Sequence, residues 1–204
     1  MKNKMFSILG LLFFVFVLNA APINTSGYIL KQYNASWNFT LPDTTLPEGY
    51  YIIIARNSDK ASFETFWGLT LPANVIFINS GGKIPQINGE ETFSLYDNYG
   101  ALIDTTDTLM NSSGGNTVQR DSMNVNTWII QSDIYATPGS GAIGGFDSGL
   151  KISEFSDASG TGNYIYEFVE LFNDSAVGTR VLRLYNNPTH PDSSEIVLIS
   201  CEIE

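Results

Sequence analysis

Residues 49–55 read GYYIIIA, the most apolar stretch of the chain beyond its first twenty residues. Three consecutive isoleucines make both faces of an extended strand apolar, which is typical of a strand in the interior of a sheet. The preceding residues 46–49 (LPEG) combine proline and glycine in the way that favours a turn. We therefore expect residues 49–55 to form a central β-strand that is entered from this turn.

Similar short segments recur along the rest of the chain. They are rich in β-branched and aromatic residues, and Gly, Asn, Asp and Pro separate them, which is the pattern of an all-β protein. Helical periodicity is absent after residue 20, so no helix is expected there. The turn 98–100 (NYG) supplies the Asx and Gly residues of a tight hairpin. The expected strands are 74–79, 91–97, 101–105, 151–155, 164–172, 181–185 and 195–203.

Two segments resemble successive parts of a lamin-tail domain. Residues 150–174 (LKISEFSDASGTGNYIYEFVELFND) are similar to the opening of that domain, where an ISE strand is followed by an ELxN strand. Residues 23–56 (INTSGYILKQYNASWNFTLPDTTLPEGYYIIIAR) are similar to its middle, where an SGWxL strand leads to an LPxG strand. In the family the ELxN segment comes first, whereas here it comes second. The chain therefore resembles a circularly permuted lamin-tail domain of the bacterial secreted type.

Three shorter motifs add to this resemblance. Residues 93–104 (FSLYDNYGALID) are similar to the family's LydxxGxxvD hairpin, residues 118–120 (VQR) to its SlqR segment, and residues 136–139 (ATPG) to its closing aTPG. Tyr28 stands where the family usually has tryptophan. The resemblance implies an immunoglobulin-like β-sandwich. It implies no catalytic residue, because none is carried over with the module.

From the permuted order we predict that residues 150–172 complete the sandwich formed by residues 23–139. Without them the N-terminal portion would lack two strands and leave backbone groups unpaired. Residues 139–149 (GSGAIGGFDSG) have the composition of a flexible linker, and the two ends of a domain are often close together. We therefore predict a single domain over residues 21–204. The alternative is a half-domain that exchanges strands with another chain.

Residues 1–20 have the features of a secretory signal peptide. Two lysines precede an apolar run of about a dozen residues, and small residues follow it. Because the run is short for a membrane span, an uncleaved anchor is the alternative rather than the expectation. We expect the mature protein to be secreted or at the cell surface, or periplasmic if the source has an outer membrane, and to have no membrane span.

The mature chain is acidic. Without Lys2 and Lys4, 8 basic residues stand against 21 acidic ones, which gives a net charge of −13. Proteins bind the phosphates of nucleic acids through Lys and Arg, so we do not expect a nucleic acid as a partner of this acidic chain. Cys201 is the sole cysteine, which excludes an internal disulfide. Its neighbours Ile199 and Ile203 favour burial of Cys201 on one face of a strand.

Aromatic side chains are the best candidates for a binding site. Tyr33, Trp37, Trp67 and Trp128 fall near predicted loops or strand ends. Aromatic rings at the ends of a sandwich can stack on sugars or anchor a protein partner. The alternative for each of the four residues is ordinary core packing.

Other patterns favour structural interpretations. We expect Glu154 and Glu170, in the ISE and ELxN motifs, to accept backbone or hydroxyl hydrogen bonds rather than to act as a catalytic pair. Residues 157–162 (DASGTG) resemble the start of a calcium loop, but Phe168 replaces its bidentate glutamate. His190 is the only histidine and lies between two prolines, so neither a hydrolase triad nor a His or Cys metal site is expected. We expect no metal and no cofactor.

The sequence thus favours a secreted, non-enzymatic binding or structural module whose partner is a protein or a glycan at the cell surface. One alternative is a carbohydrate-binding module that uses its aromatic side chains. A second alternative is an accessory domain of a secreted hydrolase.

Overall fold

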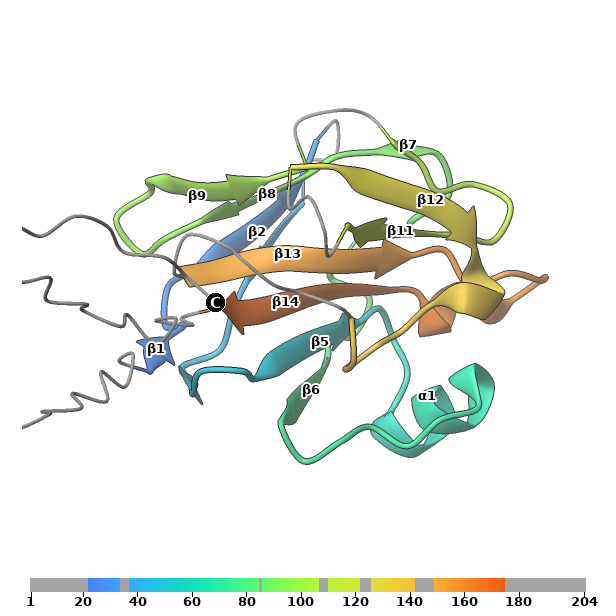
Figure 1. The fold of residues 1–204 in the computed structure, drawn as a ribbon, viewed down its shortest axis with the longest axis horizontal. Coiled ribbons are helices and arrows are strands. Elements are labelled where there is room, and N and C mark those ends of the chain that lie inside the picture. Colours follow the sequence, from blue (N-terminus) through green and yellow to red (C-terminus); the bar gives the residue numbers. More distant parts are fainter. Residues whose placement is uncertain are drawn as a thin grey trace, which may run out of the picture. The chain divides into compact units, whose positions relative to one another are not determined.

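The computed structural model describes residues 22–33, 37–84, 86–106, 110–121, 126–141 and 149–174. Within these residues the chain is mostly β, with one short α-helix and several antiparallel sheets (Figure 1). In chain order the elements are β1 (Ile23–Asn24), β2 (Ile29–Gln32), β3 (Asn38–Thr40), β4 (Thr45–Leu46), β5 (Tyr51–Ala55), α1 (Lys60–Trp67), β6 (Val75–Asn79), β7 (Glu90–Glu91), β8 (Phe93–Tyr96), β9 (Leu102–Thr105), β10 (Met110–Asn111), β11 (Asn116–Arg120), β12 (Trp128–Ser132), η1 (Asp133–Tyr135), β13 (Gly149–Ser156), η2 (Asn163–Tyr166) and β14 (Phe168–Asp174).

The larger sheet has the strand order β12-β11-β13-β14-β5-β6. Strand β5 lies inside this sheet, between β14 and β6, and all five of its residues are buried. The prediction of an interior strand at residues 49–55 is therefore confirmed. Strands β5 and β6 run parallel, so the chain crosses over between them, and helix α1 lies in that crossover.

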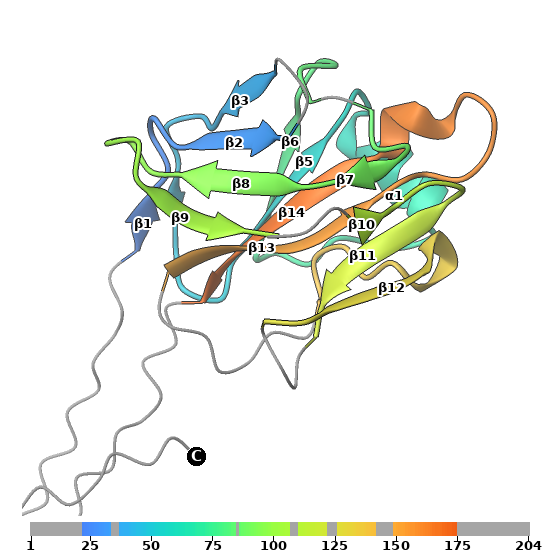
Figure 2. The ribbon, with the colours of Figure 1, turned by 90° about the horizontal axis from the view of Figure 1, so that it is seen from above.

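Strands β13 and β14 are interior strands of the same sheet. Strand β13 pairs with β11 and β14, and β14 pairs with β5, so that Val169 lies opposite Ile54. Segments that are more than 100 residues apart in the sequence are thus neighbours, with β13 and β14 inserted between β11 and β5 (Figure 2). The pairing that we predicted for residues 150–172 is present within one chain.

The smaller sheet has the strand order β3-β2-β8-β9. Strands β8 and β9 form the expected hairpin, with Asp97 accepting hydrogen bonds from the backbone N–H groups of Tyr99 and Ala101. Gly100 closes the turn with a φ of 82°, a left-handed conformation that glycine adopts without strain. Gly100 therefore has the role expected from the sequence, whereas the side chain that accepts the turn's hydrogen bonds is Asp97, just before the predicted turn residues.

Two hydrophobic clusters cover the two faces of the larger sheet. The main cluster draws side chains from both sheets, such as Leu30 and Phe93 from the smaller one and Ile52 and Ile152 from the larger one. The second cluster contains Ile53, Ala55, Phe63, Leu71 and Phe168, so it joins the opposite face of β5 and β14 to helix α1. Alternate residues of β5 point into different clusters, which explains why this strand is apolar throughout.

Helix α1 corrects the expectation that no helix follows residue 20. Its eight residues span about two turns, too few to produce a recognisable 3.6-residue pattern, and only Phe63 is fully buried. Its ends carry sequence signals nevertheless. Asp59 accepts a hydrogen bond from the backbone N–H of Ser62 at 2.9 Å, and Gly68 ends the helix with a φ of 65°.

Two boundaries also differ from those predicted. The strand expected from residue 164 begins only at Phe168, because residues 163–166 form the 3-10 helix η2, in which Tyr166 stacks on Phe66 at 4.3 Å. The predicted linker starts inside the fold, because Gly139 is buried. Its φ is 80°, and an added Cβ would lie 2.8 Å from Val75. The rest of that linker, from residue 142 to 148, is outside the described residues.

Candidate functional site

The four aromatic residues predicted as binding residues occupy three places. Tyr33 follows β2 and Trp37 precedes β3, and the two residues are 63% and 55% exposed. Trp67 is the last residue of helix α1, and Trp128 is the first residue of β12. Only Tyr33 and Trp37 lie close together in the chain and offer their rings to solvent, so they are the candidates left for ligand contact.

Trp67 belongs to the second hydrophobic cluster. Its ring centroid lies 6.0 Å from that of Phe63 and 5.4 Å from that of Phe168. The indole Nε1 donates a hydrogen bond to the backbone oxygen of Tyr166 at 3.2 Å. A side chain that packs on two buried rings and donates its N–H to a backbone oxygen contributes to core packing. This packing favours the core interpretation of Trp67.

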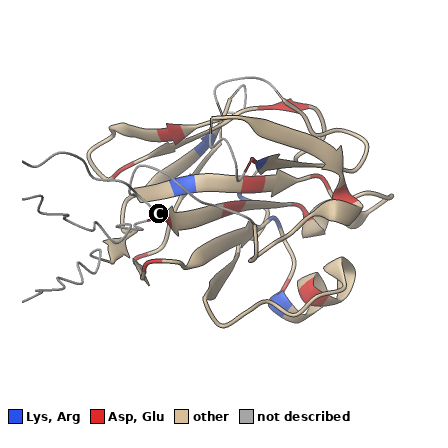
Figure 3. Cartoon of the chain, viewed as in Figure 1, with Lys and Arg blue, Asp and Glu red and all other residues tan. Residues whose placement is uncertain are grey.

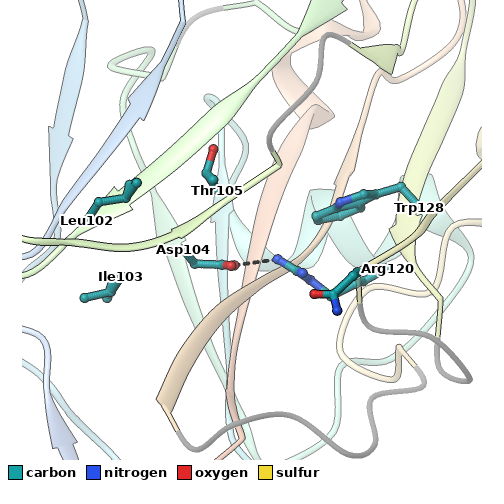
Figure 4. A pocket seen from close by; sticks show the side chains of 7 residues that line it. Leu102, Ile103, Asp104, Thr105, Arg120 and Trp128 are labelled. Atoms are coloured by element: carbon teal, nitrogen blue, oxygen red, sulfur yellow. Dashed lines mark hydrogen bonds and ion pairs between the residues drawn. The ribbon is translucent and has the colours of Figure 1, made fainter.

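Trp128 lines a cavity of about 220 Å³ between the edge regions of the two sheets (Figure 4). The guanidinium carbon of Arg120 lies 4.4 Å from the centroid of the Trp128 ring. The cavity is lined by Leu102, Ile103, Asp104, Thr105, Arg120, Asn126 and Trp128.

The two charged residues of this cavity are engaged with each other and with strand β13. Arg120 Nη2 lies 2.6 Å from Asp104 Oδ2, and both side chains are largely buried. Arg120 Nε donates to the backbone oxygen of Ile152 at 2.8 Å, and the backbone N–H of Ile152 donates to Asp104 at 2.7 Å. The pair therefore ties β9 of the smaller sheet to β11 and β13 of the larger one, and its charges neutralise each other.

The most elaborate polar arrangement in the described part of the chain surrounds Glu154. Its carboxylate accepts hydrogen bonds from the hydroxyl of Thr117 at 2.6 Å and from the amide of Gln119 at 3.0 Å. The backbone N–H of Thr137 lies 3.2 Å from both carboxylate oxygens, and the Thr137 hydroxyl lies 3.2 Å from one of them. Glu154 thus joins β13 to β11 and to the segment that follows η1.

Glu170 lies directly opposite Glu154 on β14 and holds the next part of that segment. It accepts a hydrogen bond from the backbone N–H of Gly139 at 2.5 Å and another from the hydroxyl of Ser153 at 2.6 Å. Tyr51 of β5 adds a hydrogen bond from its hydroxyl to the backbone oxygen of Gly141 at 3.0 Å. Residues 137–141 are therefore pinned over the sheet by side chains from four neighbouring strands.

Burial strongly affects how these acids ionise. Burial raises the pKa of Glu154, and burial together with the adjacent charge of Glu154 raises the pKa of Glu170 to about 8. Glu154 accepts from two hydroxyls, one amide and the Thr137 backbone N–H, which lower its pKa against the effect of burial, whereas Glu170 accepts from one backbone N–H and one hydroxyl. A buried pair of this kind carries one negative charge more easily than two.

The residues that carry the lamin-tail resemblance converge in these networks. Glu154, Glu170, Thr137, Gly139 and Gln119 come from the ISE, ELxN, ATPG and VQR segments and contact one another as described above. The asparagine of the ELxN motif, Asn173, donates to the backbone oxygen of Leu46 at 2.9 Å and so fixes the LPEG turn. Both glutamates accept backbone and hydroxyl hydrogen bonds, as expected, and both are sealed from solvent. This arrangement stabilises the fold and offers no surface to a substrate.

Acidic side chains also accept backbone hydrogen bonds elsewhere in the described part of the chain. In the segment that resembles a calcium loop, Asp157 accepts a hydrogen bond from the N–H of Gly115, and the nearby Asp133 accepts one from Ser159. Sequence reasoning missed the buried Glu167, which accepts a hydrogen bond from the N–H of Ile87 at 2.9 Å and lies 3.5 Å from Arg56. Burial raises the pKa of Glu167 to about 7. Acidic positions lie both on interior strands and in loops (Figure 3).

Several sequence predictions fall outside the described residues. These are the signal peptide at 1–20, the strands at 181–185 and 195–203, His190 and Cys201. Among the residues that are described, no group of three or more His, Cys, Asp or Glu side chains could hold a metal ion. Nor does this part of the chain contain a helix that is long and apolar enough to span a membrane.

Comparison of the chain with protein-family models, with curated proteins and with solved structures gave no match. The likeness to lamin-tail domains therefore stays a prediction from the motifs quoted above.

Proposed function

We propose that this chain is an exported, non-enzymatic structural or binding module with a circularly permuted, lamin-tail-like immunoglobulin sandwich. The proposal rests chiefly on one observation: the acidic residues of the family-like motifs are buried and hold backbone segments in place. Glu154 and Glu170 pin residues 137–141, and Asp104 with Arg120 joins strands of the two sheets. Catalytic carboxylates have to touch substrate, and these do not reach the surface.

A substrate panel tests the non-enzymatic part of the proposal. We expect the purified protein to turn over no phosphomonoester, phosphodiester, carboxylic ester or glycoside substrate above background. The matched variant is Glu170→Gln, which keeps the shape and the hydrogen-bonding capacity of the side chain. A turnover that the natural protein shows and this folded variant lacks would overturn the proposal.

Export is tested separately by sequencing the N-terminus of the protein recovered from a bacterial host. We expect the mature chain to begin close to residue 21 and to appear in the periplasmic or extracellular fraction. Full-length chain that stays in the membrane fraction would instead support an uncleaved anchor.

A second candidate function is glycan binding by Tyr33 and Trp37. Its support is the exposure of Tyr33 after β2 and of Trp37 before β3, two aromatic rings of a kind that stacks on sugars. A glycan array with Trp37→Ala and Tyr33→Ala tests this candidate. Tyr99→Ala is the control, because Tyr99 is 90% exposed on the β8–β9 turn. Binding that the first two variants lose and the control keeps would establish the glycan-binding function, and binding that all three keep would exclude Tyr33 and Trp37 as its site.

A further inference from the structure

Strand β12 forms one edge of the larger sheet and carries exposed apolar side chains. It pairs with β11 on one side, and within the described residues no strand pairs with its other side. Ile129 and Ile130 are 44% and 47% exposed, and Ile134 and Tyr135 follow at once with still greater exposure. Uncovered edges with apolar residues are sites where another strand can be added.

The ladder between β11 and β12 shows which backbone groups face outward. The Asp121 N–H donates to the Thr127 oxygen at 3.0 Å, and the Asp133 N–H donates to the Gly115 oxygen at 2.8 Å. Antiparallel ladders alternate between hydrogen-bonded and non-hydrogen-bonded pairs. With these two pairs at the ends of the ladder, Ile129 and Gln131 direct their backbone groups toward β11. The N–H and C=O groups of Trp128, Ile130 and Ser132 therefore point to the open edge.

This edge lacks the features that usually prevent a further strand from pairing with an edge strand. Natural edge strands are protected by charged side chains, prolines or bulges, and β12 (WIIQS) has none of these. The smaller sheet has two edge strands: β9 contains Asp104, and β3 (NFT) has its one apolar side chain, Phe39, buried. The opposite edge of the larger sheet, β6, has its apolar side chains half-buried. Strand β12 is thus the edge strand that has exposed isoleucines and no charged residue, proline or bulge.

We propose that β12 pairs antiparallel with β12 of a second copy of this chain, about a two-fold axis at Ile130. In this register Ile130 lies opposite its own counterpart, and Trp128 lies opposite Ser132 of the second copy. These are the three residues whose backbone groups face outward, so each pair exchanges two hydrogen bonds. The two isoleucines at position 130 cover each other on the face of the main core, and position 129 lies opposite Gln131 on the other face.

A second copy of the chain suits this edge because the outward-facing backbone donors and acceptors of one β12 strand match those of the other. The outward-facing groups fall at 128, 130 and 132, symmetrically about residue 130, so the strand is complementary to itself. No charge on β12 opposes a copy of itself, although the whole chains repel each other through their net charge of −11. We therefore expect a weak dimer that tightens as salt screens this repulsion, with an interface below about 1,200 Å².

Cross-linking tests the register directly. In a Cys201→Ser background, Ile130→Cys places two thiols opposite each other at a Cα separation of about 5.5 Å, which suits a disulfide. Ile129→Cys is the matched control, because its counterpart is displaced by two residues and lies beyond about 7 Å. Under mild oxidation we expect a covalent dimer from Ile130→Cys and several-fold less from Ile129→Cys. Equal yields from the two variants, or none from either, would overturn the proposal.

Sedimentation equilibrium tests the same interface without a cross-link. We expect the full chain to approach twice its monomer mass as concentration rises toward the millimolar range, and at lower concentration in higher salt. Ile130→Lys sets two charges against each other at the two-fold axis and should weaken dimerisation at least tenfold. Tyr99→Lys adds the same charge elsewhere and should not. If residues 175–204 cover β12 in place of a second copy, the protein will stay monomeric throughout, and the proposal fails.

Discussion

Glu154 and Glu170 lie opposite each other on the neighbouring strands β13 and β14, and both side chains are sealed from solvent. Two carboxyl groups at such positions cannot both be ionised without a large cost in free energy. Glu154 accepts from more donors than Glu170, namely two hydroxyls, one amide and one backbone N–H, and these donors stabilise a negative charge on it. The pair thereby becomes a fixed polar element of the fold.

This arrangement predicts how stability depends on pH. Burial and the charge of Glu154 raise the pKa of Glu170 from 4.5 to about 8, and burial raises that of Glu167 to about 7. A raised folded-state pKa gives stability that is complete below the unfolded value near 4.5 and is lost as pH rises through the folded value. The free energy of unfolding should therefore fall between pH 5 and 8, by up to about 1.4 kcal/mol per pH unit for each proton. Urea denaturation at pH 5, 6.5 and 8 measures this, and a free energy that rises over this range would contradict it.

Gly139 provides a test of the segment that the glutamates hold. Gly139→Ala should destabilise the protein by more than about 2 kcal/mol, because it combines a positive φ with a Cβ placed 2.8 Å from Val75. Gly114→Ala is the control. Gly114 has a similar φ of 74° but open space around the added Cβ, so its substitution should cost only about 1 kcal/mol. Thermal unfolding of both variants would show the difference, and equal losses would mean that residue 139 is not packed as described.

The Asp104–Arg120 pair should matter far more than a surface pair. Asp104→Ala removes the buried carboxylate that pairs with Arg120 and the acceptor of the Ile152 N–H, so we expect a loss of about 3–5 kcal/mol. The comparison is the solvent-exposed pair of Lys60 and Glu64 on helix α1, where Lys60→Ala should cost less than about 0.5 kcal/mol. Chemical denaturation of both variants at one pH provides the measurement. Similar effects at the two sites would argue against burial of the Asp104 pair.

The aromatic residues should separate into structural and surface groups. Trp67→Ala removes a ring that packs on Phe63 and Phe168, and large-to-small substitutions of this kind cost about 3–5 kcal/mol. Trp37→Ala should change stability by less than about 0.5 kcal/mol, because its side chain is more than half exposed. Unfolding midpoints of the two variants test the distinction, and a large loss from Trp37→Ala would show that this ring is packed after all.

The strands were easier to predict from this sequence than the short helices and the contacts between distant segments. The isoleucine run of β5 and the turn of the β8–β9 hairpin carry local signals, and both appear where expected. Helix α1 was missed because a two-turn helix with one fully buried residue leaves almost no periodic pattern. Its caps, Asp59 and Gly68, were the available signal. The delayed start of β14 depends on the stacking of Tyr166 on Phe66, a contact between distant segments that no local pattern encodes.

The candidate site was predictable only in part. The ISE and ELxN motifs pointed to Glu154 and Glu170 as hydrogen-bond acceptors, but their donors on residues 137–139 depend on how β13 and β14 enter the sheet. Glu167 was missed because its partners, Arg56 and Ile87, lie about 110 and 80 residues away in the chain. The sequence does not distinguish the exposed Trp37 from the packed Trp67, because the exposure of a side chain depends on how the chain folds.

The most direct test of the structural role of the buried glutamates is a comparison of Glu154→Gln with Glu170→Gln in urea denaturation at pH 6. In Glu154→Gln either orientation of the new amide sets its NH₂ group against the fixed N–H of Thr137, so we predict a loss of about 2 kcal/mol. In Glu170→Gln the amide oxygen accepts from Gly139 and the NH₂ group donates to Ser153, so we predict a change within about 0.5 kcal/mol and a weaker pH dependence. Unchanged stability in Glu154→Gln, or an equal loss in both variants, would contradict the account.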